Sequence, residues 1–249
     1  MKEIKSNNSA RHGGSVIHRA DSRGYFNHGW LKTYHTFSFA GYYDKARVHF
    51  GMLRVLNDDI VEGGEGFGTH PHDNMEIVTI PLYGSLAHKD SMGHEEIITP
   101  NEIQVMSAGT GITHSEYNAS DKDPVNLLQI WVFPKEHNVT PRYDQRIFDP
   151  FLMKNTIFTV VSPDKKDDSL WLNQDAYFSL SELSEGKEVE YKINTKGNGV
   201  YVFVIEGKIQ TEDETLGKRD GMGIEDEDTI NVKALTGSKV LFIEIPMTP

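Results

Sequence analysis

The amino-acid sequence predicts an all-β protein with two β-sandwich or jelly-roll barrels in one chain. Its apolar residues occur in short runs separated by Gly, Pro, Asn and Asp, and helical periodicity is scarce. Many short strands with few helices are typical of sandwiches and jelly rolls. The length of 249 residues is enough for one large or two small domains. All eleven histidines lie between His12 and His137, so the two halves differ in composition.

Seven apolar runs are the candidate strands, and each is bounded by turn residues. In chain order they are 48–55, 76–82, 102–106, 127–133, 156–161, 200–205 and 239–245. The stretch 177–193 is predicted to begin as a turn of helix near Leu180. It is predicted to end as a strand, because Val189, Tyr191 and Ile193 alternate with polar residues.

A connecting segment is predicted at about 134–150. It carries three of the ten prolines and shows no apolar alternation. The chain then divides into an N-terminal domain, 1–135, and a second part, 136–249, made of this linker and a C-terminal domain.

The second domain repeats the first in outline. A strand that reaches Gly84 and resumes beyond it has a counterpart around Gly207, and the later strands follow in the same order. We therefore expect a duplicated β-domain. Counting back 123 residues from this match places Ile193 and Thr195 opposite His70 and His72, so the second copy is expected to lack metal ligands.

Composition excludes several classes of protein. The absence of cysteine excludes disulfide scaffolds, thiol nucleophiles and thiolate metal sites. A net charge of -12 without a Lys/Arg cluster disfavours nucleic-acid binding. No stretch approaches the roughly 20 apolar residues of a membrane span, and the N-terminus lacks a signal-like apolar region. We expect a soluble cytoplasmic protein that binds metal, if at all, through His, Asp or Glu.

Two pairs of residues with i, i+2 spacing predict a metal site. His70 and His72 form one pair, and His114 and Glu116 form the other. In a strand, side chains two residues apart face the same side, so each pair can converge on one point. Three imidazoles and one carboxylate leave two octahedral positions open, which is the geometry of a catalytic metal. The alternative is a polar barrel mouth without metal.

The same residues carry a resemblance to a known family. The pattern G-x5-HxH-x3-E followed by G-x2-H-x3-N resembles the paired motifs of the cupin superfamily, read as Gly64, His70, His72, Glu76, Gly111, His114 and Asn118. Three longer segments, HGWLKTYHTFSFAGYYD, GFGTHPHDNMEIVTIPLYGSLAHKDSMGH and MSAGTGITHSEYN, resemble bacterial members of the pirin family. These are bicupins often described as quercetin 2,3-dioxygenase-like.

The resemblance implies one divalent transition metal held by His70, His72, His114 and Glu116. It implies Fe(II), with Zn, Ni, Co, Mn and Cu as other ions that such ligands accept. It also implies a flavonol such as quercetin and dioxygen as substrates. In general cupins the fourth ligand is often the glutamate after HxH, here Glu76, whereas in pirin-like proteins it is that of HxE, here Glu116.

We assign Glu116 as the ligand because its spacing from His114 repeats that of His70 and His72. Glu76 lies four residues beyond His72, roughly 13 Å along an extended strand, and is interpreted as a hydrogen-bond acceptor behind the ligands or as a solvated charge. Glu116 is the first candidate for a catalytic base that takes the substrate hydroxyl proton, and Glu76 is the second.

Other histidines and aromatic residues receive structural interpretations. His88 and His94 bracket a turn-like segment and are expected to be exposed, without a metal role. An aromatic-rich stretch contains Trp30, Phe37, Phe39, Tyr42 and Tyr43. It can form a wall for an aromatic substrate or pack in the core between the domains, and core packing is favoured.

Two other functions stay open at this point. Eukaryotic pirin-like proteins resemble metal-dependent, redox-sensitive binding partners of transcription factors, so the site could regulate a protein surface without turnover. A metal-dependent isomerase or hydrolase fits the ligands equally well. A monomer is expected, because two fused domains can bury within one chain the interface that single-domain relatives bury by dimerising.

Overall fold

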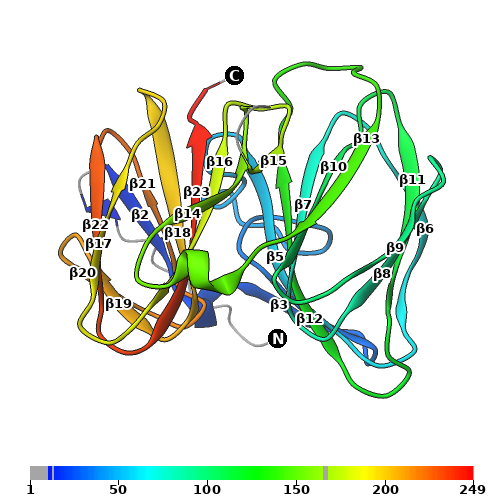
Figure 1. Cartoon of the computed structure of the whole chain (residues 1–249), viewed down its shortest axis with the longest axis horizontal. Coiled ribbons are helices and arrows are strands. Elements are labelled where there is room, and N and C mark those ends of the chain that lie inside the picture. Colours follow the sequence, from blue (N-terminus) through cyan, green and yellow to red (C-terminus); the bar gives the residue numbers. More distant parts are fainter. Residues whose placement is uncertain (1–10, 13, 165–167, 249) are drawn as a thin grey trace.

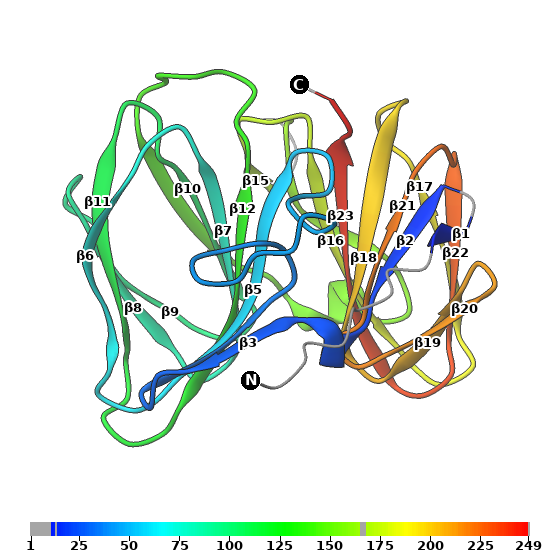
Figure 2. The same cartoon turned by 180° about the vertical axis from the view of Figure 1, so that it is seen from behind.

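The computed structural model describes residues 11, 12, 14–164 and 168–248 (Figures 1 and 2). This part of the chain forms strands and two short 3-10 helices, η1 (Ala20–Ser22) and η2 (Pro150–Met153), without an α-helix. None of its helices is long and apolar enough to cross a membrane. Four sheets form two barrels side by side (Figure 1). The prediction of an all-β chain with two barrels is confirmed.

The N-terminal barrel consists of a seven-stranded sheet and a four-stranded sheet. The larger sheet has the order β13 (Arg142–Ile147), β10 (Glu102–Ser107), β7 (Glu76–Tyr83), β12 (Val125–Val132), β5 (Leu53–Val61), β4 (Leu31–His35) and β3 (Gly24–Asn27). The smaller sheet has the order β6 (Gly66–His72), β11 (Ile112–Asn118), β8 (Leu86–Asp90) and β9 (Glu95–Ile98). The smaller sheet forms one outer side of the molecule (Figures 1 and 2).

The C-terminal barrel consists of an eight-stranded sheet and a four-stranded sheet. The larger sheet has the order β1 (Arg11–His12), β2 (Ser15–His18), β21 (Gly221–Ile224), β18 (Asn198–Glu206), β23 (Ser238–Pro246), β16 (Tyr177–Leu183), β14 (Phe158–Ser162) and β15 (Leu170–Trp171). The smaller sheet has the order β17 (Glu188–Lys192), β22 (Thr229–Ala234), β19 (Lys208–Thr211) and β20 (Glu214–Gly217).

The strand order shows the duplication directly. The order β10-β7-β12-β5 recurs as β21-β18-β23-β16, and β6-β11-β8-β9 recurs as β17-β22-β19-β20. The strands matched around Gly84 and Gly207 are therefore equivalent. The fixed offset of 123 fails for the histidine pair, because Ile193 and Thr195 follow β17, the strand in the place of β6. Loops of unequal length shift the alignment there.

Strand pairing crosses the predicted domain boundary at two places. The chain's own N-terminal strand β2 pairs with β21 of the C-terminal sheet. Strand β13 pairs along its whole length with β10 of the N-terminal sheet. The division at residue 135 stays a prediction, but the expectation of an irregular connector at 134–150 is wrong for 142–147. This edge strand is rich in polar residues, which is why it shows no apolar alternation.

Two other element predictions are corrected. The turn of helix predicted near Leu180 is wrong, because 177–183 is strand β16. Its Phe178 and Leu180 alternate onto the face buried in the core between the barrels. The run predicted at 48–55 becomes β5, which begins only at Leu53 and continues to Val61.

The apolar core differs between the two barrels. One large cluster joins the facing sheets and contains residues of both, such as Val78, Leu128 and Phe203. The C-terminal barrel has a single continuous interior cluster. The N-terminal barrel instead holds two small clusters, one around Leu127 and one around Ile77. Buried polar side chains lie in this barrel, so part of its interior volume is given to a site.

Candidate metal centre

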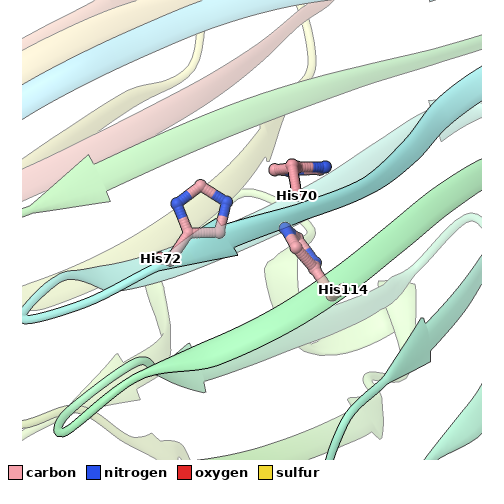
Figure 3. A group of neighbouring side chains, drawn as sticks. All are labelled: His70, His72 and His114. Carbon is pink, nitrogen blue, oxygen red and sulfur yellow. The ribbon is translucent and has the colours of Figure 1, made fainter.

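Three histidines converge inside the N-terminal barrel. His70 and His72 lie on β6, and His114 on β11 pairs in register with His70. The ring centroids are 4.4 Å apart for His70 and His114, 4.8 Å for His72 and His114, and 4.9 Å for His70 and His72. One ligand atom of each lies within 4.8 Å of the others, and the rings gather between the two strands (Figure 3).

The imidazoles have free ring nitrogens and protonation states that suit metal binding. The Nδ1 atom of His70 lies 2.8 Å from the carbonyl oxygen of Gly68, which leaves Nε2 free. Neither ring nitrogen of His114 has a hydrogen-bond partner among the described residues. Burial lowers the pKa of His72 to about 4 and that of His114 to about 2, and the neighbouring His70 adds to both shifts. Both rings are therefore neutral at pH 7, as metal binding requires.

Glu116 lies next to this cluster with its carboxylate held in place. Its two oxygens accept hydrogen bonds of 3.0 and 3.1 Å from Gln129 Nε2, and Thr79 donates to Gln129 Oε1. A carboxylate oxygen lies within 4.8 Å of a His114 ring nitrogen. His114 and Glu116 keep regular i, i+2 alternation on β11, and the register shift between them comes from an extra residue in the partner strand β6.

Burial raises the pKa of Glu116 to about 7, and the hydrogen bond from Gln129 opposes that shift. A divalent cation beside the carboxylate favours its charged form. The donor set, with neutral imidazoles, an unpartnered buried histidine and a carboxylate without thiolate, fits a transition metal such as Fe, Ni, Co or Zn.

His88 does not follow the expectation of an exposed side chain. It is 2% exposed and lies beside His114, with ring centroids 5.3 Å apart. His88 Nδ1 lies 3.2 Å from Gln104 Nε2, and His88 Nε2 lies 3.4 Å from Asp90. With His114 and Glu116, His88 forms a second group whose ligand atoms lie within 4.8 Å of one another. His94 is half-buried and pairs with Asp90 at 2.8 Å.

Glu76 is not brought to the histidine cluster. The chain turns after His72, and Glu76 begins β7 in the other sheet, so Glu76 does not lie further along the strand that carries His70 and His72. Its Oε2 accepts a hydrogen bond of 2.7 Å from Ser107 Oγ on the neighbouring strand β10 and one of 3.1 Å from the Asn173 amide in the second half of the chain. Burial raises the pKa of Glu76 to about 7.

We expect Glu76→Gln to keep metal and turnover and to be more stable at alkaline pH. The folded-state pKa of Glu76 is raised, so its contribution to stability is full below its ordinary pKa of 4.5 and is lost as pH rises through about 7. Glutamine cannot ionise. The variant should gain about 1–3 kcal/mol in unfolding free energy at pH 8 and nothing below pH 4.5. Urea unfolding at both pH values measures this difference.

Glu96→Gln, the same change at an exposed position, is the control for the Glu76 variant. A loss of turnover in Glu76→Gln with metal retained would restore Glu76 as a candidate base.

A cavity of about 220 Å³ adjoins the histidines. Aromatic side chains form part of its wall, and its lining consists of Phe39, Asn57, Asp59, Phe67, His70, His72, Glu116, Gln129 and Trp131. Of the aromatic N-terminal stretch, Phe39 lies at the cavity, whereas Phe37 packs in the core between the barrels and Tyr43 is exposed. The interpretation as a wall for an aromatic substrate therefore applies to Phe39, and the interpretation as core packing applies to Phe37.

Asn57, Asp59, Gln129 and Trp131 line the cavity but are not among the site residues predicted from the sequence. A signal was present, because Asn57 and Asp59 are polar residues with i, i+2 spacing, whereas Val55 and Val61 at the flanking positions of the same parity are apolar. Polar residues at the inward positions of a buried strand mark either a hydrogen-bond network or a binding site.

The C-terminal barrel contains no equivalent centre in the part that the structure describes, since both possible metal-binding groups lie in the N-terminal barrel. Its buried carboxylate, Glu244, is already saturated with hydrogen bonds. Its donors are the Tyr191 hydroxyl, the Asn194 amide and side chain, the Thr195 amide and the Asn198 side chain. No lone pair is left for a cation.

Two barrels of one strand order, the first with a histidine-rich metal centre, define a bicupin. Two family models match: Pirin over residues 16–132, and Quercetinase C-terminal cupin domain over residues 159–245. The Quercetin 2,3-dioxygenase of Escherichia coli (strain K12) is 44% identical over 230 residues, 92% of this chain and 98% of that protein. The chain belongs to the pirin family.

A further relative and a solved structure agree with this assignment. The Pirin-like protein of Caulobacter vibrioides is 35% identical over 225 residues, 90% of this chain and 96% of that protein. The crystal structure of bacterial pirin YhhW from Escherichia coli in complex with nickel(II) matches with a TM-score of 0.88. Its sequence identity is 42%, and the match covers 93% of this chain and 99% of that chain.

Proposed function

We propose that this protein is a metal-dependent dioxygenase that opens the oxygenated ring of flavonols such as quercetin. The observation that carries the proposal is the three-histidine centre at the wall of an aromatic-lined cavity. The similarity to the Escherichia coli protein named Quercetin 2,3-dioxygenase supports the same substrate class.

His70, His72 and His114 would hold the metal ion, and we propose Glu116 as the fourth ligand. Fe(II) is the ion we propose, and the nickel(II) complex of a relative supports a site that accepts several divalent ions. When bound, such an ion supplies Lewis-acid contact to a chelating hydroxyketone and a binding position for dioxygen. A single chain is the proposed working unit, because the core between the barrels joins both large sheets within it.

The surrounding residues of the chain position the substrate and its proton. The rings of Phe39, Phe67 and Trp131 offer flat apolar surfaces against which an aromatic ring packs and from which water is displaced. Glu116, oriented by Gln129, lies at the same cavity and is the group we propose to accept the substrate hydroxyl proton.

Oxygen uptake tests the proposal. Protein purified without oxygen and reloaded with Fe(II) is mixed with quercetin in air, beside the His72→Ala variant. We expect uptake and loss of the flavonol absorbance with wild-type protein alone. Absence of uptake by wild-type protein with one iron bound per chain would contradict the proposed function.

A further inference from the structure

Three polar atoms in the cavity wall have no hydrogen-bond partner among the described residues. They are Asn57 Oδ1, Asp59 Oδ1 and Trp131 Nε1. Asn57 is 3% exposed and Asp59 is 5% exposed, and all three residues line the cavity. None of them belongs to the set of expected metal ligands.

Strand geometry turns these side chains to the interior of the N-terminal barrel. Asn57 and Asp59 alternate along β5, and Asn57 pairs in register with Gln129, whose side chain bonds Glu116. Asp58, between them, faces the opposite way and is fully paired. Its oxygens accept hydrogen bonds from Arg23, Arg219 and Asn126. The carboxylate of Asp58, which points away from the barrel interior, is therefore fully hydrogen-bonded. Asn57 and Asp59, which point inward, each keep one side-chain oxygen without a partner among the described residues.

Unpaired buried polar atoms destabilise a folded chain, and apolar side chains of similar shape at these positions would be more stable. Their arrangement here matches one kind of ligand. Residues that line a cavity with aromatic walls carry two acceptors and one donor, so a flat molecule with hydroxyl groups on its ring can pair with all three. The cavity of about 220 Å³ is smaller than the roughly 300–1,000 Å³ typical for drug-sized ligands, so only part of a flavonol fits inside.

We propose that Asn57, Asp59 and Trp131 form a hydrogen-bonding wall that selects substrates by the hydroxyl groups on the ring inserted into the cavity. Asn57 and Asp59 accept from ring hydroxyls, and Trp131 Nε1 donates to a substrate oxygen. This inference rests on the proposed function and assigns the residues that distinguish hydroxylated flavonols from bare ones.

Ligand binding tests the inference without turnover. Protein loaded with nickel(II) under argon is titrated calorimetrically with quercetin and with 3-hydroxyflavone, which shares the chelating hydroxyketone but lacks the other ring hydroxyls. We expect wild-type protein to prefer quercetin by at least about 10-fold. Asn57→Leu and Asp59→Leu should each reduce this preference by about 3- to 10-fold and leave the Kd for 3-hydroxyflavone within about twofold.

The variants come with a matched control and a conservative alternative. Thr211→Val replaces a buried hydroxyl that also lacks a partner among the described residues but lies in the C-terminal barrel, and should leave the preference unchanged. Asp59→Asn keeps the size of the side chain if Asp59→Leu does not fold, and should reduce the preference less than leucine does. We expect the leucine variants to melt at or above the melting temperature of wild-type protein. That result would support the view that the polar atoms are kept for ligand binding and not for stability.

Two results overturn the inference in different ways. If the ratio of the two Kd values is the same in wild-type protein and in every cavity variant, these residues do not select the substrate. The proposed function is then unaffected. If wild-type protein with one nickel ion per chain binds neither flavonol, both the proposed function and the hydrogen-bonding wall are refuted.

Discussion

The His72→Ala variant is expected to lose its bound metal ion and its turnover while keeping its fold. His72 supplies one of three converging imidazoles, and the remaining pair cannot close the coordination sphere. Changes behind the ligands of a metal site already cost about 10- to 100-fold in affinity, so removal of a ligand should cost at least about 100-fold. The side chain is half-buried, so the loss of packing is small.

Metal content per chain, measured by mass spectrometry after dialysis, gives the result of the His72→Ala experiment. His28→Ala is the matched control, because His28 is exposed and lies outside the histidine cluster. One metal ion per chain in the His72 variant, at wild-type affinity, would refute the assignment of the centre.

The Asp58→Ala variant is expected to be destabilised by about 3–5 kcal/mol. Asp58 Oδ2 lies 2.9 Å from Arg219 Nε and 3.3 Å from an Arg23 nitrogen, and Oδ1 accepts from Asn126 at 2.7 Å. The side chains of Arg23 and Arg219 are 5% and 12% exposed, so removal of the carboxylate leaves Arg23 without its anion and Arg219 with only the more distant Glu206, at 3.7 Å. Denaturant unfolding at pH 7 measures the difference.

Glu95→Ala is the comparison for Asp58→Ala. It breaks an ion pair of similar length, 3.0 Å to Lys89, in which both side chains are exposed, and should cost less than about 1 kcal/mol. Equal destabilisation by the two substitutions would contradict the view that burial of the arginines, rather than the number of ion pairs, sets the stability of this contact.

Strands buried on both faces could be located from sequence. β7, β12, β18 and β23 lie in the two facing sheets, so their side chains are apolar at nearly every position and read as continuous runs. β13 could not be located, because it is a sheet edge and its side chains are largely polar. β13 pairs with β10, a strand that lies some 40 residues earlier in the chain. A local sequence pattern does not reveal a pairing of this kind.

Part of the metal centre could be predicted from the sequence, because some of its residues lie close together on one strand. His70 and His72 share a strand, so their spacing alone predicts that they converge. The position of Glu76 could not be predicted from its spacing, because the turn at 73–75 moves the chain into the other sheet. The cavity residues Asn57 and Gln129 become neighbours only through the register of β5 and β12, and His88 reaches His114 only through the pairing of β8 and β11.

The pairing of β2 with β21 sets a constraint on how this protein is made. Ser15 pairs with Ile224, so about 200 residues must leave the ribosome after β2 before its partner strand exists. At roughly 5–20 residues per second this takes roughly 10 to 40 s. During that interval the apolar side of β2 has no sheet to cover it. The C-terminal barrel is therefore closed by a segment that is synthesised before the N-terminal barrel.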